Sequence, residues 1–214
     1  MKDKYIIALD GPSGAGKSTI SKLISQKLNI EYLDTGAMYR AVTKYFLDNN
    51  IELENDDEIK NTLDKIKITF ESGDIYLNNE NISDEIRTEE INSNVSFISS
   101  LKSIREFLVN EQRNISKNKS IILDGRDIGT VVFPNADYKF FLTASSDVRA
   151  KRRYDQDITN ETFEEIKSSI EKRDYFDSHR EISPLKRACD AILIDSSNLT
   201  IEQTVNEIIN VIKG

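Results

Sequence analysis

Residues 11–18 have the types and spacing needed to hold a chain of phosphate groups. They read Gly-Pro-Ser-Gly-Ala-Gly-Lys-Ser and match the pattern GxxxxGK[ST] in full. Glycines let backbone N–H groups approach phosphate oxygens, and a helix that starts at the end of the loop adds free donors and a partial positive charge. In such a loop Lys17 reaches the β- and γ-phosphates, and the Ser18 hydroxyl holds Mg²⁺. The residues expected to bind ATP are Gly11, Pro12, Ser13, Gly14, Ala15, Gly16, Lys17, Ser18 and Thr19.

Two further arginines follow apolar runs that are typical of central strands. Arg40 lies about one turn into a helix after the run 31–34, and Thr35 is expected to cap that helix. Arg126, followed by Asp127, comes directly after another such run. Open α/β sheets bind ligands beyond the carboxyl ends of their strands. Either arginine alone fits an ordinary turn, whereas the two together favour an anion site.

Arginines are also concentrated in two segments nearer the C-terminus. Arg173, Asp177 and Arg180 are spaced i, i+4, i+7 and share one face of a helix, where a solvated ion-pair ladder is the simpler interpretation. A second basic run stands out in an acidic chain. Because arginine is suited to bidentate contacts with phosphate, this run indicates phosphate binding. That run, at the start of a predicted helix, contains Arg149, Lys151, Arg152 and Arg153.

The phosphate loop alone does not specify the reaction. A GTPase would ordinarily carry an N-K-x-D motif, and the nearest string, residues 118–121, lacks the aspartate. A kinase for a small acceptor, such as a nucleotide or a sugar acid, remains open. So does a nucleotide-dependent switch or binding module that transfers phosphate to no small molecule.

Short apolar β-branched runs alternate with helical patterns, which indicates βαβ units and a parallel sheet. We expect a P-loop three-layer α/β/α fold with a mostly parallel five-stranded sheet. The expected strands cover residues 5–10, 31–34, 120–124, 138–142 and 191–195, the last three as central strands, and the expected helices cover 17–28, 36–49 and 88–115. A final helix has a capping box, Thr200 and Gln203, and an apolar stripe of Ile201, Val205, Ile208, Ile209 and Ile212.

One stretch interrupts this alternation. Ile66, Ile68 and Phe70 alternate with polar residues, a turn follows at 72–74, and the pattern then resumes, which predicts an antiparallel hairpin. We expect a single domain over 1–214 with an inserted subdomain at 60–86.

The composition sets limits on partners and location. The net charge of −8 argues against nucleic-acid binding, and the single cysteine, Cys189, excludes an internal disulfide framework or a multi-cysteine zinc site. No apolar run approaches the roughly 20 residues that cross a bilayer. We therefore expect a cytoplasmic protein without membrane partners. The absence of a heptad seam predicts a monomer.

Three strings together resemble those of bacterial cytidylate kinases, P-loop enzymes of the nucleoside monophosphate kinase group. They are LDTGAMYR at 33–40, LDGRDIGTVVFP at 123–134 and RDxxDxxR at 173–180, and the resemblance covers essentially the whole chain. It implies transfer of the γ-phosphate of ATP to CMP or dCMP with Mg²⁺.

The resemblance also implies roles for individual residues. Arg40, Arg126 and Arg180 would hold the CMP phosphate. Ser96, Arg105 and Asp127 would read the cytosine. Arg173 and Asp177 would contact the sugar, and Thr35 and Tyr39 complete the CMP-binding set. The insert at 60–86 would belong to the CMP-binding part.

On the donor side, the resemblance implies a lid at 149–160 whose arginines close over the phosphates of ATP, and a loop at 195–198 that receives adenine. The catalytic set would be Lys17, Arg126, Arg149 and Arg153.

Overall fold

The computed structural model describes residues 4–71, 73–156 and 161–214. The chain divides into two compact units, one formed by residues 1–33 and 116–214 and the other by residues 34–115. The expected lid at 149–160 includes residues 157–160, which lie outside the described residues.

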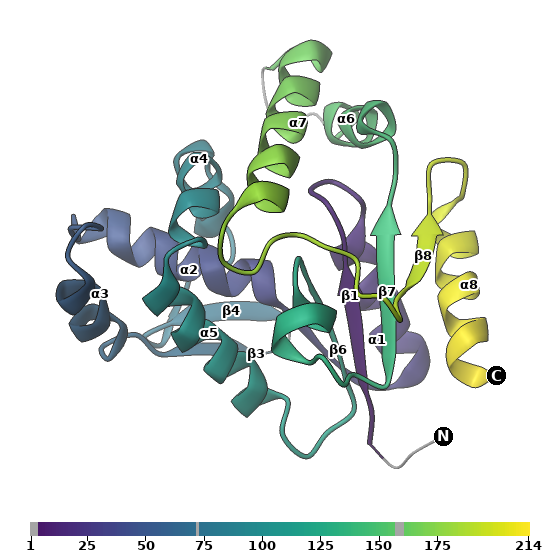
Figure 1. Ribbon diagram of the computed structural model, residues 1–214, viewed down its shortest axis with the longest axis horizontal. Helices are drawn as coiled ribbons and strands as arrows, with labels where there is room; N and C mark the ends of the chain where they lie inside the picture. The colour runs from purple at the N-terminus through teal and green to yellow at the C-terminus, as the bar shows by residue number, and fades with distance from the viewer. Residues whose placement is uncertain (1–3, 72, 157–160) are drawn as a thin grey trace. The chain divides into compact units, whose positions relative to one another are not determined.

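The first unit is built on a five-stranded sheet with the order β2-β6-β1-β7-β8 (Figure 1). β1 pairs in parallel with β6 and β7, and β7 pairs in parallel with β8. The expected α/β class with a mostly parallel sheet is confirmed. The strands are β1 (Ile6–Asp10), β2 (Glu31–Asp34), β6 (Ile121–Gly125), β7 (Tyr138–Thr143) and β8 (Ile192–Asp195).

Apolar side chains of the strands and of two helices form the core of this unit. α1 (Lys17–Leu28) contributes Ile20 and Ile24, and α8 (Ile201–Lys213) contributes Val205 and Ile208. The predicted capping box of α8 is present, since Thr200 and Gln203 each bond the backbone of the other. The predicted apolar stripe is wrong at its first residue, because Ile201 is 56% exposed.

The prediction that 191–195 is a central strand is wrong. β8 lies at the edge of the sheet, and its Ile192 and Leu193 are 42% and 49% exposed. A short apolar run cannot distinguish an edge strand from a central one, because the local pattern does not reveal whether a second neighbour is present.

Two helices follow β7 and pack on each other in the same unit (Figure 1). They are α6 (Ser146–Tyr154) and α7 (Phe163–His179), joined by a small core of Ala150, Ile166 and Ile170. Thr162 and Glu165 form a capping box that starts α7. A short helical turn, η2 (Ile128–Val132), follows β6.

The second unit combines four helices, among the residues described, with a small antiparallel sheet of order β3-β4-β5. The predicted hairpin is confirmed as β3 (Ile68–Glu71) and β4 (Asp74–Leu77), although Ser72 of its turn lies outside the described residues. The expected insert at 60–86 falls inside this unit. The other elements are α2 (Thr35–Asp48), α3 (Asp56–Leu63), β5 (Glu80–Asn81), η1 (Glu85–Arg87), α4 (Glu89–Ile98) and α5 (Lys102–Ile115).

Two helix boundaries in this unit differ from the sequence prediction. The single helix expected over 88–115 is two helices, and the hydroxyls of Ser99 and Ser100 bond carbonyls three residues earlier at the break. Such bonds compete with helix propagation. The cap of α2 is Asp34, whose side chain accepts from the Ala37 N–H at 2.9 Å, and Thr35 is instead the first, buried residue of the helix.

The described helices include none that is both long enough and apolar enough to cross a bilayer.

Candidate active site

The phosphate loop connects β1 to α1 in the predicted order of strand, loop and helix. Gly11 passes so close to β7 that a Cβ there would overlap the carbonyl oxygen of Leu142. Gly16 precedes the helix with φ of 90°, a left-handed conformation that favours glycine. These two positions explain why a loop of this shape cannot be built from larger residues.

Lys17 is buried at the base of the loop, with 6% of its surface exposed. Its Nζ donates to the carbonyl oxygen of Pro12 at 2.9 Å. Burial, followed by repulsion from Arg126, lowers the pKa of Lys17 to about 7, although Asp124 and Asp10 act in the opposite direction. The loop therefore holds a cation that lacks a full counter-charge, which favours an anionic ligand.

Ser18 and Asp124 place two oxygens side by side. The Ser18 hydroxyl donates to Asp124 Oδ2 at 3.2 Å, and the Tyr32 hydroxyl donates to Asp124 Oδ1 at 2.7 Å. Hydroxyl and carboxylate oxygens are ligands that Mg²⁺ accepts, and this ion usually takes few ligands from the protein and the rest from phosphates and water. The pair fits that chemistry. The described residues contain no cluster of three or more His, Cys, Asp or Glu side chains that could hold a metal by themselves.

Arg149 is buried between the phosphate loop and α7. Its Nε donates to the carbonyl of Ala144 at 2.9 Å, and its Nη1 donates to the carbonyl of Ser13 at 2.9 Å and to Asp174 Oδ2 at 2.6 Å. The other oxygen of Asp174 accepts from the Ser13 N–H at 3.3 Å. Asp174 was not among the predicted site residues, although it directly follows Arg173 in the RDxxDxxR string.

The other arginines of α6 have different surroundings. Arg153 is partly exposed, and its Nη2 lies 3.9 Å from Glu161 Oε2. Arg152 donates to the carbonyl and hydroxyl of Ser196 at 2.7 and 3.2 Å. It thus contacts the loop at 195–198 that the resemblance assigns to adenine.

We expect Arg149→Ala to lower the free energy of unfolding by about 2 kcal/mol, because a partly buried carboxylate and two carbonyls lose their buried donor. Arg153→Ala should cost less than about 1 kcal/mol, since its ion pair is exposed and long. Urea unfolding followed by circular dichroism measures both. An Arg149→Ala protein as stable as the Arg153 variant would show that Arg149 does not brace the loop.

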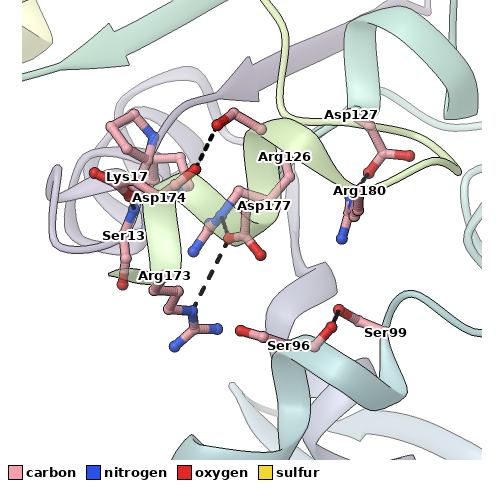
Figure 2. Close-up of polar contacts among 12 residues, drawn as sticks. Ser13, Lys17, Ser96, Ser99, Arg126, Asp127, Arg173, Asp174, Asp177 and Arg180 are labelled. Carbon is pink, nitrogen blue, oxygen red and sulfur yellow. Dashed lines mark hydrogen bonds and ion pairs between the residues drawn. The ribbon is translucent and has the colours of Figure 1, made fainter. Parts of the chain in front are cut away.

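Three arginines surround two buried carboxylates near the carboxyl end of β6 (Figure 2). Arg126 Nε donates to Asp177 Oδ2 at 2.9 Å, and Arg173 Nε lies 4.0 Å from the same oxygen. Arg180 Nη2 lies 3.9 Å from Asp127 Oδ1. With three positive and two negative groups, the cluster has an excess of positive charge.

The electrostatics of this cluster favour an anion. Burial alone would raise the pKa of Asp177, but Arg126, Arg173 and Arg180 outweigh it and hold that pKa below its usual value. Burial and repulsion from Arg126 lower the pKa of Arg173 to about 10. Guanidinium groups that destabilise one another in this way gain most from a phosphate that neutralises them.

The predicted face i, i+4, i+7 is only partly correct. Arg173 and Asp177 lie on α7, but the helix ends at His179 and Arg180 turns away with ψ of 144°. Arg180 Nε donates to the Ser183 carbonyl at 2.7 Å while its Nη2 faces Asp127. The charges therefore form a buried network rather than a solvated ladder.

The second unit holds the remaining candidates. The Arg105 side chain is buried, donates to the Ser99 carbonyl at 3.1 Å and lies over the ring of Tyr39 at 5.4 Å. The carbonyl of Ser96 accepts from the Ser99 hydroxyl at 2.9 Å (Figure 2). Thr35, Tyr39, Arg40, Ser96 and Arg105 all belong to this unit.

Arg40 is held by α4 and the turn before it. Its Nη1 donates to the Asn92 side chain and to the carbonyl of Ile86, and the Asn92 amide in turn donates to the carbonyl of Arg87 at 3.1 Å. Asn92 was missed in the sequence, where no spacing relates it to Arg40.

Comparisons with known proteins agree with the resemblance of the three strings. The family model described as cytidylate kinase matches residues 7–214. A cytidylate kinase from Fusobacterium nucleatum is 51% identical over 207 residues, 95% of each chain, and one from Clostridium botulinum is 50% identical over 210 residues, 97% of each. A shikimate kinase structure from Acinetobacter baumannii, with 15% identity and a TM-score of 0.52, covers 99% of this chain and 94% of its own and shares the fold. The chain belongs to the cytidylate kinase family.

Proposed function

We propose that the protein transfers the γ-phosphate of ATP to CMP or dCMP, giving ADP and CDP or dCDP. This proposal rests on a sequence identity of about 50%, over nearly the full length of the chain, to proteins named cytidylate kinases. Neither alternative, a kinase for a different acceptor or a binding module, is favoured by these relatives. The monomeric state and the cytoplasmic location stay predictions from the sequence.

On the donor side, residues 11–19 bind the triphosphate of ATP, and Lys17 neutralises its β- and γ-phosphates. Ser18, and Asp124 beside it, would hold Mg²⁺, which supplies further neutralisation of the phosphates when bound. Arg149 and Arg153 act on the transferred phosphate. Arg149 bonds the Ser13 carbonyl and Asp174, and these bonds keep its positive charge beside the phosphate loop, which supports this role.

On the acceptor side, Arg40, Arg126 and Arg180 bind the CMP phosphate, and Arg173 and Asp177 bind the ribose. Ser96, Arg105 and Asp127 read the cytosine, with Thr35 and Tyr39 completing the set. The excess positive charge around Asp177 supports the phosphate role.

The reaction needs no general base. A phosphate oxygen of CMP, already anionic near neutral pH, attacks the γ-phosphorus, and the bond from that phosphorus to the bridging oxygen of ADP breaks. The chain's contribution is to position the two phosphates in line and to neutralise their charge. His179, the single histidine, is exposed at the end of α7 and is not needed.

A coupled assay of ADP release tests the proposal. ATP and Mg²⁺ are supplied alone and then with CMP, dCMP, UMP, AMP, shikimate or gluconate. We expect release to depend on CMP or dCMP and the product to be the diphosphate. Release that depends on another acceptor, or on none, would contradict it.

The low pKa of Lys17 predicts proton uptake when ATP binds. At pH 8, one unit above a pKa of about 7, Lys17 is mostly neutral in the free protein. The bound triphosphate favours the charged form, so binding should take up nearly one proton and ATP affinity should fall as pH rises above 7. Titration calorimetry in two buffers of different ionisation enthalpy measures the uptake. Lys17→Arg should abolish it, because arginine stays charged in both states.

A further inference from the structure

Asp10 is a buried acid to which neither the phosphate-loop pattern nor the proposed reaction gives a role. It is the last residue of β1, directly before Gly11, and 4% of its surface is exposed. Its Oδ1 accepts from the Ile128 N–H and its Oδ2 from the Gly129 N–H, both at 2.7 Å. Both oxygens are therefore used to hold backbone from a different segment of the chain.

That segment begins immediately after Arg126 and Asp127. The parallel register pairs Asp10 with Gly125, the last residue of β6. Beyond Gly125 the chain leaves the sheet, so strand pairing no longer determines its path. The two hydrogen bonds that Asp10 accepts hold the backbone at Ile128 and Gly129, directly after Arg126 and Asp127.

The turn is shaped to allow this approach. A Cβ at Gly129 would lie 3.3 Å from Lys139 Cδ, which is tighter than most Cβ contacts, and 3.4 Å from Asp10 Oδ2, at the limit of ordinary van der Waals contact. Burial raises the pKa of Asp10 to about 6, and the negative charge of the neighbouring Asp127 also raises it. The two N–H bonds lower the pKa but do not outweigh burial. The fold keeps a charge here at a cost that the two charge-assisted bonds offset only in part.

We propose that Asp10 is a positioning residue that sets where Arg126 and Asp127 stand relative to the phosphate loop. The Asp10 carboxylate thereby connects the phosphate loop, which binds ATP, to the turn after β6, whose Arg126 and Asp127 bind CMP. This inference rests on the proposed function, because it assigns Arg126 and Asp127 to CMP.

The test replaces Asp10 by asparagine and uses Asp137→Asn as its matched control. Asp137 makes a similar bond at the other end of the same strand, where its Oδ2 accepts from the Ile6 N–H at 2.9 Å. In Asp10→Asn one backbone N–H must face an amide NH₂, so the turn must shift. We expect the KM for CMP to rise about ten-fold or more and the preference for CMP over UMP to fall. The dissociation constant for ATP should change less than about three-fold, and Asp137→Asn should leave all three near wild type.

A purely structural role predicts a different result. Loss of folded protein lowers the melting temperature and kcat, but it leaves the KM for CMP and the CMP-to-UMP ratio unchanged, and that result would overturn the inference. If Asp10→Asn does not fold, Gly129→Ala disturbs the same contact with Asp10 intact and should show the same rise in KM for CMP. Failure of both variants to fold would also reject a positioning role. Wild-type protein that ignores CMP would instead contradict the proposed function.

Discussion

Replacement of Lys17 by methionine lowers CMP-dependent ADP release by roughly 10³-fold or more. Phosphoryl transfer depends almost entirely on positioning and charge neutralisation, and Lys17 is the charge within the phosphate loop. Its Nζ lies on the loop itself, bonded to the Pro12 carbonyl, so the amine is in position before a nucleotide binds, and the bound triphosphate favours its charged form. Single-turnover rates with saturating ATP and CMP separate the chemical step from binding.

The same substitution should not unfold the protein. Lys17 is a buried cation whose pKa is lowered by burial and by Arg126, so its charge is a source of strain in the empty loop. Methionine has a similar length and no charge. We expect the melting temperature to stay the same or rise.

Lys22→Ala is the control, because Lys22 lies on the same helix with an exposed side chain. It should keep wild-type rates. Near-normal transfer by the Lys17→Met protein would show that the phosphate loop does not bind the donor as proposed.

The phosphate loop could be predicted from the sequence because its information is local. Eight consecutive residues specify it, and the need for glycine at positions 11 and 16 comes from the backbone of the loop and from one neighbouring strand. The central strands β1, β6 and β7 were predictable for a similar reason, since their runs are apolar on both faces.

The contacts that organise the site could not be predicted, because they join residues far apart in the sequence. The bond from Arg149 to Ser13 spans 136 positions, and the bond from Asp10 to Ile128 spans 118. Periodicity places a residue on a face of a helix but does not say what faces it. The lid role of Arg149 comes from the resemblance and stays a prediction; the burial of its guanidinium against the phosphate loop is visible only in the structure.

Helix ends account for the misplaced Arg180. The spacing of Arg173, Asp177 and Arg180 fits a continuous helix, and no glycine or proline marks its end near His179. Beyond the helix end the Arg180 side chain contacts Ser183 and Asp127, which the spacing alone does not reveal.

Replacement of Asp127 by asparagine should remove most of the preference for CMP over UMP. In the proposed complex the buried carboxylate accepts a hydrogen bond from the cytosine amino group. UMP has a carbonyl oxygen at that position, which an acceptor-only carboxylate repels. Asparagine can turn either its oxygen or its NH₂ toward the base and so pairs with both. We expect kcat/KM for CMP to fall roughly 100-fold and that for UMP to stay level or rise.

Asp177→Asn distinguishes base reading from a general loss of the acceptor site. Asp177 is as deeply buried as Asp127, but it pairs with Arg126 and Arg173, which are assigned to the phosphate and the sugar that CMP and UMP share. Its loss should lower kcat/KM for both nucleotides by a similar factor and leave their ratio unchanged. If Asp127→Asn also lowers both equally, Asp127 supports the arginines, in particular Arg180, and the cytosine is read by other side chains. Asp127 recognises the cytosine only if the ratio of kcat/KM for CMP to that for UMP changes in the Asp127 variant and not in the Asp177 variant.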